Sequence, residues 1–143
     1  MKANKMCAIL GNEHEYSGLM PLTENRPLST LYFDCKYRIM DFAISSAANA
    51  NIRTVYIILN EGRVKSVFDH LGGGREWGLD SIGSYQYLSF YQDILRKKAE
   101  GKDYYGNIID FLRKSKSAYT VFIGNKMLCN IDLRTVLNVH QSQ

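Results

Sequence analysis

The sequence predicts an α/β protein built on a mostly parallel, Rossmann-like sheet with helices on both faces. Three short runs of β-branched, aromatic and other apolar residues have the length and composition of buried strands. These runs are Met6–Leu10, Thr54–Leu59 and Tyr119–Ile123. Segments between them repeat apolar residues at helical spacing, and strands that alternate with helices are typical of a parallel sheet.

The remaining elements follow from periodicity and from residues that end helices. Polar residues with Gly, Ser and Pro predict an irregular loop over Gly11–Asn25, and the three glycines from Gly72 to Gly74 end the second helix. Asp132 is a good N-cap for the last helix. The expected helices are Arg38–Ala50, Val64–Leu71, Tyr104–Lys114 and Leu133–His140, with a possible further strand at Tyr85–Phe90.

Length and composition limit the class of protein. The 143 residues suit one domain, and a sequence that is 45% hydrophobic and 22% charged is typical of a soluble globular protein. No apolar run is long enough to cross a membrane. The apolar stretch near the N-terminus stops at Gly11, too early for a signal peptide, so a cytoplasmic location is expected.

Charge and cysteine usage exclude further classes. The net charge of +4 comes from basic residues that are spread along the chain, whereas nucleic-acid binders concentrate them on one face. Cys7, Cys35 and Cys129 are odd in number and far apart, which disfavours a disulfide framework or a zinc site. The three histidines have no Ser, Cys or Asp partner at a suggestive spacing and are interpreted as ordinary structural residues.

Two common nucleotide-binding motifs are absent. A dinucleotide fingerprint would place three glycines directly after the first strand, but Gly11–Gly18 contains few glycines and includes Glu13 and Glu15, which would repel phosphate. The glycines from Gly72 to Gly74 follow a helix and therefore do not form a phosphate loop. A dinucleotide-dependent dehydrogenase and a P-loop ATPase are thus excluded.

The stretch from Gly18 to Ile52 carries a family resemblance. It contains Pro21-Leu22-Thr23, then Lys36-Tyr37-Arg38-Ile39-Met40-Asp41-Phe42. In order and spacing this is similar to the opening of the sugar-phosphate nucleotidyltransferases, above all of glucose-1-phosphate adenylyltransferase (ADP-glucose pyrophosphorylase). The segment from Cys129 to Leu133 resembles the GlgD-type branch of that family, and the resemblance spans nearly the whole chain. It implies that residues 1–143 form the N-terminal part of a nucleotidyltransferase-like domain, whose remainder and β-helix domain would follow.

The sequence departs from the family pattern at positions that stabilise charge during adenylyl transfer. Active relatives carry an arginine, a lysine and a metal-binding aspartate where this sequence has Gly18, Leu28 and Lys126 (or Asn125 if the gap in the alignment moves). Adenylyl transfer depends on Mg²⁺ and cations that stabilise charge on phosphoryl oxygens. The loss of all three groups predicts a subunit that does not catalyse, with no metal or cofactor of its own.

The resemblance also implies a role. GlgD-type subunits pair with a catalytic paralogue, which would use Mg²⁺ and ATP, and modulate its activity in glycogen synthesis. Arg26, Lys36 and Arg38 are the candidate residues for an anionic effector or sugar phosphate, although Lys36 and Arg38 could instead cap or pair with Asp34 and Asp41. Two alternatives remain open: an active nucleotidyltransferase with a divergent phosphate loop, and a stand-alone module that binds a nucleotide or a sugar phosphate.

Overall fold

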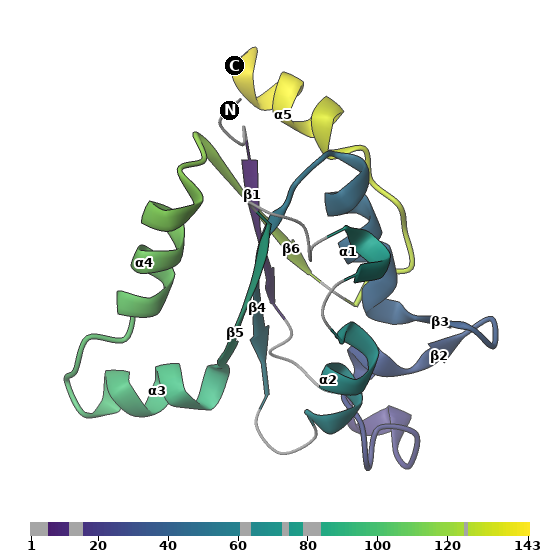
Figure 1. Ribbon diagram of the computed structural model, residues 1–143. Coiled ribbons are helices and arrows are strands. Elements are labelled where there is room, and N and C mark those ends of the chain that lie inside the picture. The colour runs from purple at the N-terminus through teal and green to yellow at the C-terminus, as the bar shows by residue number, and fades with distance from the viewer. Residues whose placement is uncertain (1–5, 12–15, 61–63, 73–74, 79–83, 125) are drawn as a thin grey trace.

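A four-stranded parallel sheet forms the centre of the protein (Figure 1). The computed structural model describes residues 6–11, 16–60, 64–72, 75–78, 84–124 and 126–143. The strand order is β5-β4-β1-β6, and every neighbouring pair is parallel. The strands are β1 Met6–Gly11, β4 Thr54–Leu59, β5 Tyr85–Phe90 and β6 Tyr119–Gly124, so the predicted α/β class and all four expected strands are confirmed.

The register aligns the carboxyl ends of the strands. Gly11 lies opposite Ile58 of β4 and opposite Gly124 of β6. The two central strands, β1 and β4, are buried along their whole length. The expectation that Tyr119–Ile123 is buried is wrong, since only Ile123 is buried in β6. The reason is position: β6 is an edge strand, so neighbours cover it less completely than they cover β1.

Helices cover both faces of the sheet, as predicted (Figure 1). Helices α1 Ile39–Asn49, α2 Lys65–Leu71 and α5 Leu133–Gln141 lie on one face. Helices α3 Tyr91–Ala99 and α4 Gly106–Ser115 lie on the other. No described helix is long and apolar enough to cross a membrane.

Alternation along the strands divides the core into two clusters, because successive side chains of a strand point to opposite faces. On the first face, Leu10 and Ile57 pack with Met40 and Ile44 of α1. On the second face, Cys7 and Ile9 of β1 and Tyr56 of β4 pack with Phe111 of α4. The Tyr56 ring stacks on Tyr87 at 5.2 Å between centroids, and burial raises the pKa of the Tyr56 hydroxyl.

Local capping sets where two helices begin. The Asp41 carboxylate accepts a hydrogen bond from the backbone N–H of Arg38 at 2.8 Å, which caps the start of α1. Asp103 accepts bonds from the backbone N–H groups of Tyr105 and Gly106, both at 3.0 Å. Helix α4 therefore begins at Gly106, two residues later than its apolar pattern predicts.

A short hairpin precedes α1 and was not predicted. Its strands are β2 Tyr32–Phe33 and β3 Tyr37–Arg38, which pair antiparallel. Asp34 and Cys35 form the turn with φ values of 51° and 60°, a left-handed conformation for which glycine and asparagine are the usual sequence signals. Three short 3₁₀ helices complete the described elements: η1 Ser17–Leu19, η2 Leu28–Thr30 and η3 Arg75–Trp77.

Candidate functional site

The carboxyl edge of the sheet is where open α/β sheets bind ligands. Here that edge is formed by the ends of β1, β4 and β6, which the register brings together. Lys126 follows β6, and its ammonium lies 5.5 Å from the centre of the Tyr16 ring. Tyr16 belongs to the segment after β1, so the segments that follow β1 and β6, which are far apart in the sequence, are in contact here. The result is a cation at this edge, next to an aromatic ring.

Gly18 occupies an open position in η1. A Cβ atom added to Gly18 would meet nothing within 4 Å, and its φ angle needs no glycine. The backbone at Gly18 can therefore carry a side chain, such as the arginine expected in active relatives, without a clash at its Cβ atom. Glu13 and Glu15, which were predicted to repel phosphate in the preceding loop, lie outside the described residues, as does Asn125.

Leu28 has a packing role that its position in the alignment did not indicate. It lies in η2 with a relative exposure of 6%. A lysine at this place would have to move an ammonium group from water into an apolar environment, or reach out of it along its methylene chain. The side chain that departs from the family pattern thus contributes to the interior of this chain.

Arg26 and Arg38 both approach the exposed ring of Tyr32. The Arg38 guanidinium lies 3.4 Å from the ring centre and donates a hydrogen bond to the backbone oxygen of Thr30 at 2.8 Å. The Arg26 guanidinium lies 5.6 Å from the same ring centre. Cations are attracted to aromatic faces, and here one ring holds two of them in a small area. This arrangement can receive an anion, because the hydrogen bond to Thr30 engages one guanidinium N–H group of Arg38 and leaves others to donate within the described part of the chain.

Lys36 is set apart from those two arginines, in the turn of the hairpin. Its ammonium lies 6.0 Å from the centre of the Tyr37 ring. Among the described residues, Lys36 forms no ion pair with Asp34, and the Arg38 guanidinium forms none with Asp41. The alternative interpretation is therefore correct only in part: Asp41 does bind Arg38, but through its backbone N–H group.

Asp41 and His70 form a close pair that the sequence analysis missed. His70 Nε2 and Asp41 Oδ1 are 2.5 Å apart, and both side chains are largely buried. The pair agrees with the interpretation of His70 as a structural histidine and identifies its partner. The two residues are far apart in sequence and meet because α1 and α2 pack against the same face of the sheet, so no local spacing could have indicated the contact.

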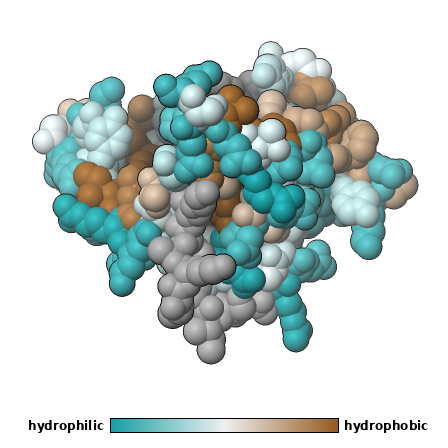
Figure 2. Space-filling view, turned by 90° about the horizontal axis from the view of Figure 1, so that it is seen from above, coloured by the Kyte–Doolittle hydropathy of each residue, from teal (hydrophilic) through white to brown (hydrophobic). Residues whose placement is uncertain are grey.

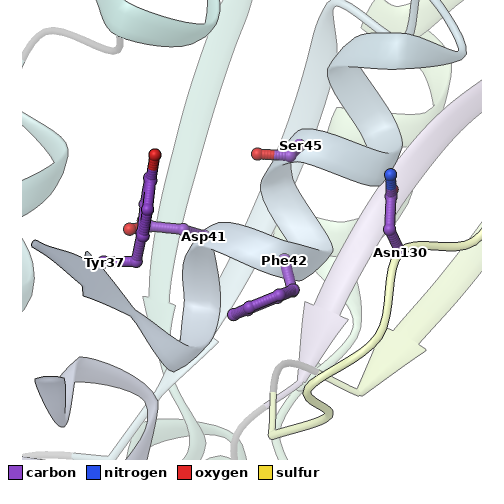
Figure 3. Close-up of a pocket in the computed structure, with 5 residues that line it drawn as sticks. All are labelled: Tyr37, Asp41, Phe42, Ser45 and Asn130. Carbon is purple, nitrogen blue, oxygen red and sulfur yellow. The ribbon is translucent and has the colours of Figure 1, made fainter. Parts of the chain in front are cut away.

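A pocket of about 220 Å³ opens beside α1 (Figure 3). Tyr37, Asp41, Phe42 and Ser45 line it from the hairpin and the helix, and Asn130 lies across the helix from Tyr37 and Asp41. Asn130 belongs to the extended segment between β6 and α5. Among the described residues, no group of three or more His, Cys, Asp or Glu side chains is gathered closely enough to hold a metal ion.

The parallel sheet, the residues at its carboxyl edge and the sequence motifs together define a nucleotidyltransferase-type domain. The family model for nucleotidyl transferases matches residues 17–143, and the chain belongs to this family. It is 30% identical over 140 residues to the glycogen biosynthesis protein GlgD of Geobacillus stearothermophilus, which covers 96% of this chain and 40% of that protein. It is 26% identical over 136 residues to glucose-1-phosphate adenylyltransferase of Aliivibrio fischeri, covering 90% of this chain and 32% of the relative.

A solved structure supports the fold independently. A putative glucose-1-phosphate thymidylyltransferase from Bacillus anthracis, solved in complex with sucrose, superposes with a TM-score of 0.68 at 19% identity. The match covers 96% of this chain and 51% of that one. The chain thus spans about 40% of the length of the GlgD proteins that it matches. The predicted resemblance to the GlgD branch of the adenylyltransferase family is confirmed.

Proposed function

We propose that this chain is part of a non-catalytic, regulatory subunit of an ADP-glucose pyrophosphorylase in glycogen biosynthesis. The proposal rests on similarity to proteins named GlgD and on the chemistry of the carboxyl edge. The subunit pairs with a catalytic paralogue, which binds ATP and Mg²⁺ and carries out the reaction. A cytoplasmic location goes with this role, because the paralogue's substrates are metabolites of that compartment.

The position of Lys126 carries the argument against catalysis. Its ammonium lies against Tyr16, beside the segment that follows the first strand. Active relatives use an aspartate at the equivalent point to hold the metal ion. A cation repels Mg²⁺, and without the metal the charge on the reacting phosphates is not stabilised. Gly18 and Leu28 add to the deficit, because neither can supply positive charge to a triphosphate.

The decisive experiment measures ADP-glucose formation by the purified full-length protein alone and together with its paralogue. The proposal expects no turnover by the protein alone and an altered rate or effector response of the mixture. Turnover by the protein alone at a rate near that of a catalytic homologue would support the active enzyme with a divergent loop. A protein that never copurifies with a paralogue, and never alters its kinetics, would support the stand-alone binding module.

An effector site formed by Arg26 and Arg38 fits the regulatory role. Two guanidinium groups beside one exposed ring suit an anion such as a sugar phosphate. Lys36 adds positive charge to the same hairpin and would attract the ligand at longer range. Binding here could be communicated to α1, since Arg38 is the residue directly before that helix.

A further inference from the structure

A groove lies beside α1, and its described lining residues include none of Tyr16, Gly18 and Lys126 at the carboxyl edge. The pocket of about 220 Å³ in Figure 3 has a neighbour of about 340 Å³, and Tyr37, Asp41 and Ser45 line both. Trp77 of η3 closes the second part. The larger volume alone falls in the range of roughly 300–1,000 Å³ that is usual for small-molecule sites.

Polar groups in the groove are placed to bind a ligand. The hydroxyl of Ser45 projects from α1 toward the side on which Tyr37 and Asp41 lie (Figure 3), and within the described part of the chain neither the Ser45 nor the Tyr37 hydroxyl has a hydrogen-bond partner. The neighbouring Ser46 differs, since its hydroxyl donates to the Phe42 backbone oxygen at 2.8 Å. The Ser46 hydroxyl also lies 3.1 Å from the Asn130 side-chain amide, and this contact uses only part of the amide's capacity to hydrogen-bond a ligand.

The remaining lining residues define the ligand's chemistry. Trp77 is fixed edge-on against His70 at 5.7 Å between ring centres and provides an aromatic wall. Asn49 and Glu76 add an amide and a carboxylate at the rim, and none of the described lining residues is a lysine or an arginine. Phosphate would meet the carboxylates of Asp41 and Glu76 here, whereas Lys36 is not among the described lining residues and its ammonium lies 6.0 Å from the centre of the Tyr37 ring. Asp41 already accepts bonds from His70 and from the Arg38 backbone, so a cationic ligand would find only part of its charge available.

We infer that this groove binds a neutral saccharide. Hydroxyl, amide and carboxylate groups can exchange hydrogen bonds with the hydroxyls of a sugar, and the aromatic rings can pack against its C–H faces. The inference concerns a different surface from the proposed anion site and does not rest on the proposed function. A failure of one would therefore leave the other standing.

Intrinsic fluorescence offers a direct test, because Trp77 is the single tryptophan of the sequence. Maltose serves as the neutral probe, with glucose 1-phosphate and putrescine as the anionic and cationic comparisons. We expect a saturable change of the Trp77 emission with maltose, and at least about tenfold weaker effects of the two charged compounds. An unresponsive Trp77, or tighter binding of either charged compound, would overturn the inference.

Variants locate the response. Ser45→Met places a longer side chain at the point shared by both parts of the groove and should weaken maltose binding about tenfold or more. Asn49→Ala, at an exposed helix position, should weaken it about threefold by removing one hydrogen-bonding group. Asn138→Ala is the matched control on α5 and should change nothing. If circular dichroism shows that Ser45→Met does not fold, maltose binding by Asn49→Ala provides the test. Maltose binding that is unchanged in the folded variants would contradict the assignment of the groove.

Discussion

Asp41 connects two helices at once: one carboxylate oxygen lies 2.5 Å from His70 Nε2 of α2, and the other caps the start of α1 at the backbone N–H of Arg38. This double role fixes the hairpin, α1 and α2 relative to one another. Asp41 also lines the groove, together with Tyr37 and Ser45. The contribution of the Asp41–His70 pair to protein stability can therefore be measured without any ligand.

Replacing Asp41 should destabilise the fold. Asp41→Ala removes the cap and leaves the largely buried His70 without its partner, at a cost of about 2–3 kcal/mol in the free energy of unfolding. Asp41→Asn keeps an acceptor for the cap and should cost less. Urea unfolding monitored by circular dichroism measures both, and a loss below about 1 kcal/mol for Asp41→Ala would show that the pair contributes little.

Anion binding at the hairpin should depend on both arginines. Arg26→Ala and Arg38→Ala are each expected to weaken binding of glucose 1-phosphate about tenfold, since each removes a charge-assisted donor. The exposed Arg113 of α4 provides the control, and Arg113→Ala should have no effect. Calorimetry at two salt concentrations adds a second check, because binding to these exposed groups should weaken as salt screens them. Equal loss in all three variants would indicate nonspecific attraction.

The 143-residue chain is expected to self-associate. Phe122 on the edge strand β6 is 62% exposed, and Val136 and Val139 expose apolar surface on the nearby α5. An unpaired strand edge beside apolar residues favours association. Figure 2 views the end of the molecule that carries both termini and shows hydrophobic surface between hydrophilic side chains.

Sedimentation velocity over a range of concentrations tests this expectation. Val139→Lys should shift the distribution toward monomer, because it places a charge within the apolar surface. Leu95→Lys on α3 is the matched control, since Leu95 is comparably exposed at 45% but lies on the opposite side of the sheet. A clean monomer of the unmodified chain with a high, cooperative melting transition would contradict the prediction.

Restoring one lost group should not restore catalysis. In the full-length protein, Lys126→Asp alone is expected to give no Mg²⁺-dependent synthesis of ADP-glucose, because a missing charge-stabilising group typically costs about 3 kcal/mol, or on the order of a hundredfold in rate. Groups that act on one triphosphate are coupled, so their costs need not add. The smallest set expected to give detectable activity is Gly18→Arg, Leu28→Lys and Lys126→Asp, and the next step is to remove Glu13 and Glu15 as well.

The surroundings of Gly18 and Leu28 affect the stability of these variants as well as their activity. Gly18→Arg is sterically open, whereas Leu28→Lys introduces an ammonium at a buried position. The melting temperature of each variant therefore has to be measured beside its pyrophosphate-coupled activity. The 143 residues by themselves are expected to be inactive in every variant, because they match only 40% of the length of the GlgD relatives. Any turnover by that chain would contradict its assignment as the first part of the domain.

Helix α5 should lose stability in acid. Asp132 accepts a hydrogen bond from the backbone N–H of Arg134 at 3.0 Å, and this bond, followed by that from the Arg134 side chain, lowers the pKa of the Asp132 carboxyl. A lowered pKa in the folded state means that the contribution is present above the unfolded pKa of about 4 and disappears as pH falls through the folded value. Thermal unfolding between neutral and acidic pH should therefore show a smaller acid loss for Asp132→Asn than for the unmodified chain. Parallel curves for the two proteins would exclude a contribution from this cap.

The sequence by itself determined the sheet and most of its helices. The central strands β1 and β4 are buried on both faces, so their composition alone marks them, and the apolar spacing of α1, α2, α4 and α5 reflects the single face that each packs against the sheet. The motif residues from Pro21 to Phe42 further identified the family.

Helix α3 escaped prediction for a specific reason. No residue of α3 is fully buried: Tyr91 and Ile94 are only partly buried against the core, and Asp93 forms ion pairs with Arg96 at 2.6 Å and with Lys97 at 2.9 Å. The first cause of the lowered pKa of Asp93 is its hydrogen bond with Lys97, and the second is that with Arg96. Apolar periodicity cannot detect a helix whose local support is of this kind.

Only the tertiary structure decided which side chains meet. His70 and Asp41, Arg26 and Tyr32, and Lys126 and Tyr16 are brought together by packing of separate segments. Likewise, the sequence alone marks Leu28 as a lost charge, whereas its side chain contributes to the interior. The local pattern of apolar residues predicts strands and helices, because backbone hydrogen bonding and burial repeat with a regular period in each of them. Contacts between distant side chains depend instead on how those elements cross, and that is set by the packing of the whole domain.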